Sequence, residues 1–136
     1  MNAAAYIPRT LETTLRRALA QFPAVMLTGP RQAGKTTLLR RALDETHGYV
    51  SLDAMDVREA ARTDPRGFLA AHPPPLILDE VQHAPALLTY VKERIDEERD
   101  RRGLWVLTGS QNLLLAKGVT ETLAGRVALL RLLPLS

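Results

Sequence analysis

The sequence contains no cysteine, few aromatic residues and no long hydrophobic run. The absence of cysteine excludes a disulfide framework and any metal site built on thiolates. Aromatic residues make up only 4% of the chain, so it has no aromatic platform on which nucleic acid bases would stack. No apolar stretch reaches the ~18 residues of a membrane-spanning helix. Because residues 1–5 also lack the charge and the apolar core of a signal peptide, we expect a cytoplasmic location and no membrane partner.

The charge of the chain is only slightly unbalanced. There are 18 lysine and arginine residues against 15 aspartate and glutamate residues, a net charge of +3. The high isoelectric point, about 9.7, leaves nucleic acid as a weakly supported partner, whereas the spread of the charges favours a generally solvated surface. His47, His72 and His83 are far apart in the sequence and lack the spacing of metal ligands, so we expect no metal site built on them.

The most informative motif is Gly-Pro-Arg-Gln-Ala-Gly-Lys-Thr at residues 29–36. It fits the pattern G-x-x-x-x-G-K-[ST], a loop that wraps the phosphates of a nucleotide. The apolar run 24–28 before it predicts a buried strand, and the apolar spacing of 37–43 after it predicts a helix. Strand, glycine loop and helix, in this order, are the context in which the motif binds phosphate.

The residue types in this loop each have a chemical reason. Gly29 and Gly34 let the backbone turn tightly and bring amides close to phosphate oxygens. The following helix adds a positive dipole end, Lys35 is a compact charge for the β- and γ-phosphates, and Thr36 offers a hydroxyl to Mg²⁺. The residues that we assign to nucleotide binding are Gly29, Pro30, Arg31, Gln32, Ala33, Gly34, Lys35, Thr36 and Thr37.

Apolar strands alternate with helical patterns along the rest of the chain. The predicted strands are 24–28, 49–52, 76–78, 104–107 and 127–133. The predicted helices are 10–21, 37–43, 56–62, 65–71 and 86–101, with short helical pieces at 113–117 and 121–124. This alternation, with strands that are apolar on both faces, predicts an α/β fold with a parallel sheet covered on both sides.

Polar groups follow the predicted strands, and the carboxyl ends of parallel strands share one edge of a sheet. The second strand ends at Asp53, and the third delivers Asp79 and Glu80, which have the form of a Walker B motif. In that interpretation Asp79 holds Mg²⁺, and Glu80 orients the attacking water or accepts its proton. The alternative is an acidic pair that caps a loop. The adjacent carboxylates, and the lack of an Asn-Lys-x-Asp motif, argue against a GTPase.

Two further candidates come from the end of the fourth strand and the start of the fifth. In the turn after 104–107, Ser110 is the first choice, and Asn112 the second, for a sensor that contacts the attacking water or the γ-phosphate; the alternative is a polar helix cap. Arg126 immediately precedes the fifth strand and is a candidate to stabilise transition-state charge in a neighbouring subunit. The alternative for Arg126 is an ion pair with a local carboxylate.

Five ordered segments together resemble a known family. They are 29–39, 49–53, 76–82, 107–112 and the Leu-Ala-Gly-Arg…Leu-Pro-Leu-Ser pattern between 123 and 136. With them, 6–136 resembles the AAA-type ATP-binding core of a prokaryotic P-loop ATPase family that usually carries a C-terminal uncharacterised, nuclease-like domain. Because the chain stops just past an apolar strand, we expect residues 1–136 to be one nucleotide-binding core, truncated before a lid and that domain.

The resemblance implies a three-layer P-loop NTPase fold with a five-stranded, mainly parallel sheet, whose central phosphate-loop strand lies beside the fourth. It implies ATP and Mg²⁺ at Lys35, Thr36, Asp79 and Glu80, a sensor near Ser110, and an arginine finger at Arg126 that would form part of a homo-oligomer. The favoured function is hydrolysis of ATP to ADP and phosphate, coupled to conformational change elsewhere in a longer protein. The alternatives are a nucleotide-dependent switch without efficient hydrolysis and, less favoured because of the adjacent carboxylates, a small-molecule phosphotransferase.

Overall fold

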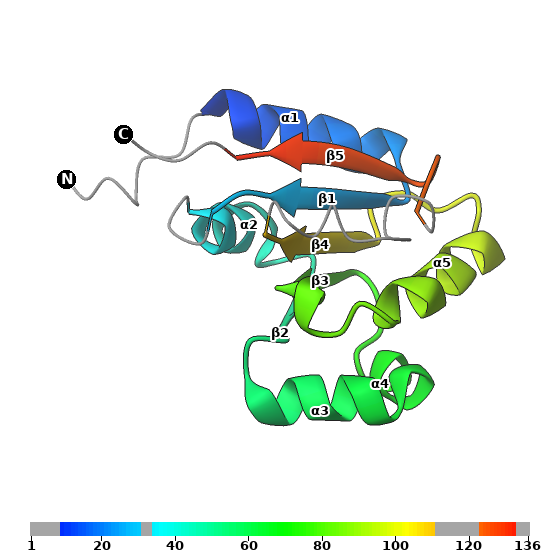
Figure 1. Ribbon diagram of the computed structural model, residues 1–136. Helices are drawn as coiled ribbons and strands as arrows, with labels where there is room; N and C mark the ends of the chain where they lie inside the picture. Colours follow the sequence, from blue (N-terminus) through cyan, green and yellow to red (C-terminus); the bar gives the residue numbers. More distant parts are fainter. Residues whose placement is uncertain (1–8, 31–33, 111–122, 133–136) are drawn as a thin grey trace.

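All five strands of the sheet run parallel, in the spatial order β2-β3-β4-β1-β5 (Figure 1). The computed structural model describes residues 9–30, 34–110 and 123–132. The strands are β1 (Ala24–Thr28), β2 (Gly48–Ser51), β3 (Leu76–Asp79), β4 (Trp105–Gly109) and β5 (Val127–Arg131). The predicted five-stranded parallel sheet is therefore confirmed, and β1, which leads into the phosphate loop, lies inside it between β4 and β5.

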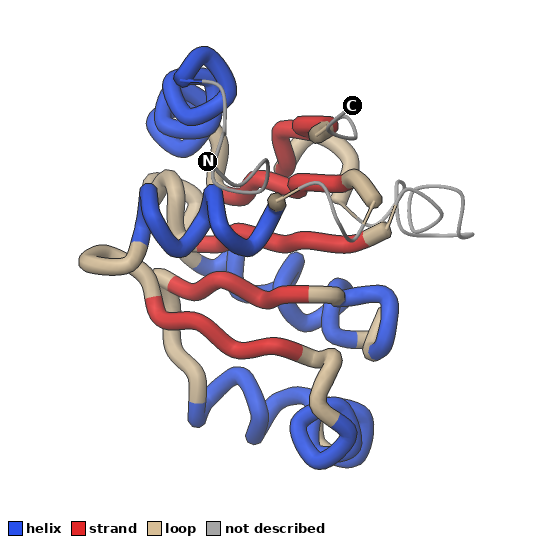
Figure 2. The backbone as a smooth tube through the Cα atoms, turned by 90° about the vertical axis from the view of Figure 1, so that its left-hand side faces the viewer, coloured by secondary structure: helices blue, strands red, loops and turns tan. Residues whose placement is uncertain are grey.

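Helices cover both faces of the sheet, since parallel strands need crossover connections. One face is covered by α1 (Arg9–Gln21) and α2 (Lys35–Leu43). The other is covered by α3 (Met55–Thr63), α4 (Pro65–Ala71) and α5 (Leu87–Glu97), and a short 3₁₀ turn, η3 (Val81–His83), follows β3. Figure 2 shows the strands side by side, flanked by the helices. In the part of the chain that the structure describes, no helix is long and apolar enough to cross a membrane.

Two hydrophobic clusters hold the three layers together, one on each face of the sheet. Successive strand residues point to opposite faces: Met26 of β1 joins the cluster under α3, α4 and α5, whereas its neighbour Leu27 joins the cluster under α1 and α2. Every residue of β1, β3 and β4 is buried. Continuous burial of this kind is typical of parallel strands with helices on both sides.

The longest predicted helix ends earlier than expected. The sequence predicts a helix over 86–101, but α5 ends at Glu97, and Glu98 has left the helical conformation at φ −122°. Ile95 is the last residue of α5 buried in the core. Residues 96–102 are all charged, so no apolar side chain holds a further turn against the sheet. Gly103, at φ +69°, then turns the chain into β4.

The segments after β4 can be compared with the sequence expectations only in part. The predicted helical piece 113–117 lies outside the described residues, as does Asn112. Of the predicted piece 121–124, only the last two residues are described, and they belong to a turn closed by a hydrogen bond from Arg126 N to Leu123 O. β5 follows this turn and ends at Arg131, short of the predicted 127–133.

The parallel arrangement gives the sheet two chemically different edges. Every strand ends at what we call the carboxyl edge, where β1 is followed by Gly29, β3 by Glu80 and β4 by Ser110. Every strand begins at the opposite, amino edge. In open α/β sheets, ligands bind outside the carboxyl ends of the strands, so the carboxyl edge is the place to look for a site.

Candidate functional site

The two glycines of the phosphate loop are required by the backbone around them. A Cβ atom at Gly29 would lie 2.5 Å from the carbonyl oxygen of Leu132, at the end of β5. Gly34 is the N-cap of α2 and adopts the left-handed conformation at φ +86°, which glycine reaches without steric cost. Gly29 therefore excludes a side chain, and the backbone at Gly34 favours glycine. Residues 31–33, which contain three of the assigned phosphate-binding residues, lie outside the described residues.

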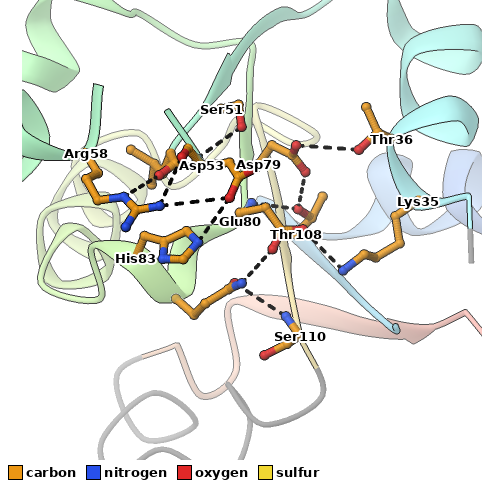
Figure 3. Close-up of polar contacts among 12 residues, drawn as sticks. Lys35, Thr36, Ser51, Asp53, Arg58, Asp79, Glu80, His83, Thr108 and Ser110 are labelled. Carbon is orange, nitrogen blue, oxygen red and sulfur yellow. Dashed lines mark hydrogen bonds and ion pairs between the residues drawn. The ribbon is translucent and has the colours of Figure 1, made fainter. Parts of the chain in front are cut away.

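Lys35, the first residue of α2, places a buried cation at the carboxyl edge. Its side chain is almost completely enclosed. Nζ donates hydrogen bonds to the carbonyl oxygens of Gly29, at 2.9 Å, and of Gly109, at 3.0 Å, and lies 3.5 Å from Oε1 of Glu80. A buried ammonium group needs such partners because it has lost its hydration. The loop, the end of β4 and the residue after β3 thus converge on one side chain. Figure 3 shows Lys35 beside Glu80.

Asp79, the last residue of β3, is held by three hydroxyl groups. Thr108 donates to Oδ1 at 2.5 Å, Tyr49 donates to Oδ2 at 2.6 Å, and Thr36 Oγ1 lies 3.5 Å from the same Oδ2. Asp79 as a whole residue is only 5% exposed. Burial, followed by the hydrogen bond to Asp79, raises the pKa of Tyr49 to about 12. The phenol is therefore a proton donor to the carboxylate at neutral pH.

Glu80 turns away from the strand and is held at both carboxylate oxygens. Its backbone is left-handed, at φ +61°, a conformation that is uncommon outside glycine. Its amide donates to Thr108 Oγ1 at 2.9 Å. Lys35 approaches Oε1, and Gln82 Nε2 donates to Oε2 at 2.5 Å. The amide of Ser110 in turn lies 3.4 Å from Oε1 of Gln82, so Gln82 links Glu80 to the turn after β4.

A cluster of three side chains, centred on Asp53, lies beside this site just after the end of β2. The carboxylate of Asp53 lies 3.4 Å from Nε2 of His83 and 3.9 Å from Nη2 of Arg58. Figure 3 shows these three residues on the side of Asp79 opposite to Thr36 and Lys35. Asp53 therefore lies at the predicted edge, next to Asp79 and Glu80.

Arg126 lies at the amino edge, away from the phosphate loop. It precedes Val127, which pairs with Ala24 at the start of β1, whereas the loop follows the end of β1. Its guanidinium forms a bidentate ion pair with Asp96 of α5, with Nε 2.8 Å from Oδ1 and Nη2 3.2 Å from Oδ2. Nη1 also donates to Ala124 O at 3.0 Å. The hydrogen bond from Arg126 lowers the pKa of Asp96.

The structure therefore brings together most of the residues singled out in the sequence. Lys35, Thr36, Asp79, Glu80 and Ser110 meet at the carboxyl edge, with Pro30 and Thr37 at the two ends of the loop. Arg126 does not join them within one chain. Tyr49, Thr108 and Gln82 were not predicted as individual site residues. The available signals were a tyrosine at the start of the predicted strand 49–52, a threonine after an apolar strand, and an amide two residues after Glu80.

Three comparisons relate this chain to known proteins. The family model described as an AAA domain matches residues 21–136. "Uncharacterized protein Mb2031c" of Mycobacterium bovis and "Uncharacterized protein Rv2008c" of Mycobacterium tuberculosis are each 36% identical over 125 residues, which cover 91% of this chain. The chain spans only 28% of the length of these relatives.

The structural comparison finds the same fold in an archaeal protein. The solved structure of the Walker-type ATPase PABY2304 of Pyrococcus abyssi is similar to this chain, with a TM-score of 0.62 and 17% sequence identity. The likeness covers 95% of this chain and 54% of that one. It confirms the predicted three-layer α/β architecture of the P-loop NTPase type.

Proposed function

Because the chain belongs to the AAA domain family, we propose that it binds ATP with Mg²⁺ at the carboxyl edge and hydrolyses ATP to ADP and phosphate. The observation that carries the proposal is the convergence of Lys35 and Thr36 with Asp79 and Glu80, which are more than forty residues away in the sequence. The name of the Pyrococcus protein, a Walker-type ATPase, supports the same reaction class.

Phosphate binding is assigned to the loop and the first turn of α2. The free amides at a helix N-terminus and the positive end of its dipole attract anions. Lys35 is held by two carbonyl oxygens and one carboxylate. A triphosphate carries several negative charges, whereas Glu80 carries one and the carbonyl oxygens carry none. We therefore expect Lys35 to exchange its contact with Glu80 for the β- and γ-phosphates.

The donor set fits Mg²⁺. This ion prefers oxygen ligands and keeps several of its waters, and the structure places Thr36 Oγ1 and Asp79 Oδ2 3.5 Å apart at the mouth of the loop. These two residues would hold the ion, directly or through water. When bound, Mg²⁺ neutralises charge on the phosphate oxygens.

Glu80 is the proposed base. It lies beside Lys35 and hence beside the expected position of the terminal phosphates. A carboxylate there can orient a water molecule and accept its proton as the bond to the γ-phosphate forms. Ser110 is proposed as the sensor because its backbone is linked to Glu80 through Gln82. Arg126 is proposed to act in the site of a neighbouring copy.

One observation favours a second candidate, a nucleotide-dependent switch that hydrolyses ATP poorly. Both carboxylate oxygens of Glu80 are engaged by side chains of the protein, Lys35 and Gln82. A base held in this way would activate water only after these contacts change. The relatives are longer than this chain, which spans 28% of their length. In either case we propose that the change between the ATP-bound and ATP-free states alters the conformation of further parts of such a longer protein.

ATP binding by calorimetry and phosphate release, measured on the same protein with and without Mg²⁺, test the proposal. Binding with magnesium-dependent release supports the ATPase, and binding without release supports the switch. Lys35→Ala is the matched variant, and it should lose nearly all ATP affinity. Equal affinity in Lys35→Ala and wild type, or no ATP binding by wild type, would overturn the assignment of the site.

A further inference from the structure

The shortest contact at Oδ2 of Asp79 comes from a residue outside the nucleotide-binding motifs. The hydroxyl of Tyr49 lies 2.6 Å from Oδ2, whereas Oγ1 of Thr36, the motif residue, lies 3.5 Å from the same oxygen. Tyr49 belongs to β2, the strand at the edge of the sheet next to β3. An edge strand therefore supplies the closest partner of the oxygen that faces the phosphate loop.

The ring of Tyr49 is fixed between the helix that carries Thr36 and the strand that carries Asp79. Tyr49 pairs with Ile77 of β3, which places it on the same face of the sheet as Asp79, two residues along. It packs against the hydrophobic cluster under α1 and α2. The guanidinium of Arg40, from α2, lies 5.0 Å from the centre of the ring, an arrangement that attracts the cation to the ring face.

Two hydroxyl groups together fix the orientation of the Asp79 carboxylate. Thr108 donates to Oδ1 and Tyr49 donates to Oδ2, from opposite neighbours of β3. With both oxygens engaged, rotation of the carboxylate would break at least one hydrogen bond to a charged group. Without Tyr49, Thr108 would still bind Oδ1, but Oδ2 would keep only the longer contact to Thr36.

From this geometry we propose that Tyr49 is a positioning residue that presents Oδ2 of Asp79 to the metal, and thereby lowers the Mg²⁺ concentration at which ATP binds tightly. The proposal rests on the proposed function, since it concerns the same ATP and Mg²⁺ site. Tyr49 acts through Asp79 and not on the nucleotide. Its loss should therefore change the metal requirement and leave the affinity for metal-free ATP unchanged.

The test is ATP affinity, measured by calorimetry on the full chain over a series of Mg²⁺ concentrations and in excess EDTA. Tyr49→Phe keeps the ring and removes the hydroxyl. We expect the Mg²⁺ concentration that gives half of the metal-dependent gain in affinity to rise about tenfold, the equivalent of one hydrogen bond to a charged group. Affinity in EDTA should equal that of wild type, and excess Mg²⁺ should restore tight binding.

Tyr90→Phe is the matched control. Tyr90 also has an arginine over its ring, Arg66 at 5.1 Å, but it lies in α5 on the other face of the sheet. This variant should reproduce the wild-type magnesium curve. Tyr49→Phe should also have no further effect on the magnesium curve when it is combined with Asp79→Ala, because the carboxylate on which the hydroxyl acts is then absent.

The results separate the two hypotheses. A wild-type protein that does not bind ATP, or binds it without regard to Mg²⁺, overturns the proposed function and this inference with it. A wild type that responds to Mg²⁺ beside a Tyr49→Phe variant with the same curve overturns the inference alone. Equal losses with and without Mg²⁺, or an unchanged effect of Tyr49→Phe in the Asp79→Ala background, would likewise overturn it.

Discussion

Lys35 and Glu80 form a buried ion pair, with Nζ of the lysine 3.5 Å from Oε1 of the glutamate. The pair joins the residue that we expect to hold the phosphates to the residue that we expect to activate water. A nucleotide that captures Lys35 therefore also changes the surroundings of Glu80. We therefore expect nucleotide binding and water activation to be coupled through the contact between Lys35 and Glu80.

The ion pair between Lys35 and Glu80 should contribute to the free energy of unfolding of the protein without nucleotide. Lys35→Ala leaves the carboxylate of Glu80 buried without its cation, which costs about 3 kcal/mol for typical buried pairs. In the double variant Lys35→Ala/Glu80→Gln the unpaired charge is also removed, so part of that loss should be recovered. Urea unfolding of both variants and of Glu80→Gln measures the difference. A double variant that is destabilised by the sum of the two single changes would show that the pair has no energetic coupling.

Glu80→Gln should separate binding from hydrolysis. The amide keeps the shape of the side chain but cannot accept a proton, so turnover should fall by roughly 10²–10⁴-fold, the usual contribution of general-base catalysis. ATP affinity, measured by calorimetry, should stay close to that of wild type. Hydrolysis at the wild-type rate in this variant would return the Asp79-Glu80 pair to a structural role.

Arg126 should affect turnover only where copies of the protein assemble. Because it lies at the amino edge, paired with Asp96, it can reach a phosphate loop only on another copy. Arg126→Ala in the longer protein should lower turnover by about 10³-fold or more, as for arginine fingers, with little change in ATP affinity. Asp96→Asn is the control that weakens the ion pair and keeps the arginine.

Assemblies that mix two variants test directly whether Arg126 acts in the site of a neighbouring subunit. Subunits with Arg126→Ala contain an intact Glu80, and subunits with Glu80→Gln contain an intact arginine, so co-assembly should restore part of the hydrolysis rate. We also expect ATP to promote self-association, which sedimentation measures. A monomer with full ATPase activity would leave Arg126 as the local partner of Asp96.

His47 should make the fold sensitive to mild acid. Its ring nitrogens lie 2.8 Å from Gly103 O and from Thr46 Oγ1, and burial lowers the pKa of His47 below its usual 6.5. The unfolded chain then takes up the proton first, so stability is complete above about pH 6.5 and falls as the pH drops towards the pKa of the folded state.

The measurement is the urea midpoint at about pH 7.5 and about pH 5.5. His47→Gln should lose less stability between these two values than wild type does. His72→Gln, with a different histidine removed, should keep the wild-type difference. An identical loss in His47→Gln and wild type would assign the acid sensitivity to other groups.

The residues that sequence reasoning located are those whose placement follows from local geometry. The loop spacing requires Gly34 and Lys35 to open a helix, and Asp79 follows directly from a short apolar strand. The hydroxyl partners of Asp79 were missed for a physical reason. Tyr49 and Thr108 are 30 and 29 residues away in the sequence, and only the order and register of the strands bring them to one carboxylate.

The end of α5 shows a limit of a different kind. Most of the charged residues 96–102 are glutamate and arginine, which have good intrinsic helix propensity, and the sequence predicted that the helix continues to 101. Contact with the sheet ends at Ile95, and a helix held mainly by its buried face ends soon after that face does. The sequence could not identify Asp96 as the ion-pair partner of Arg126, because that contact depends on where this helix ends.

The position of Arg126 limits the symmetry of any assembly that uses it. Arg126 and Gly29 lie at opposite edges of the same sheet, separated by the full length of β1, whose five residues span about 16 Å. A copy that inserts Arg126 into a neighbour's loop has its own loop at the other end of β1 from that contact. Every loop can be filled if the subunits follow one another head to tail, in a closed ring or an open filament. A twofold dimer can fill both loops only if its two copies run antiparallel, so that each arginine lies level with the partner's loop.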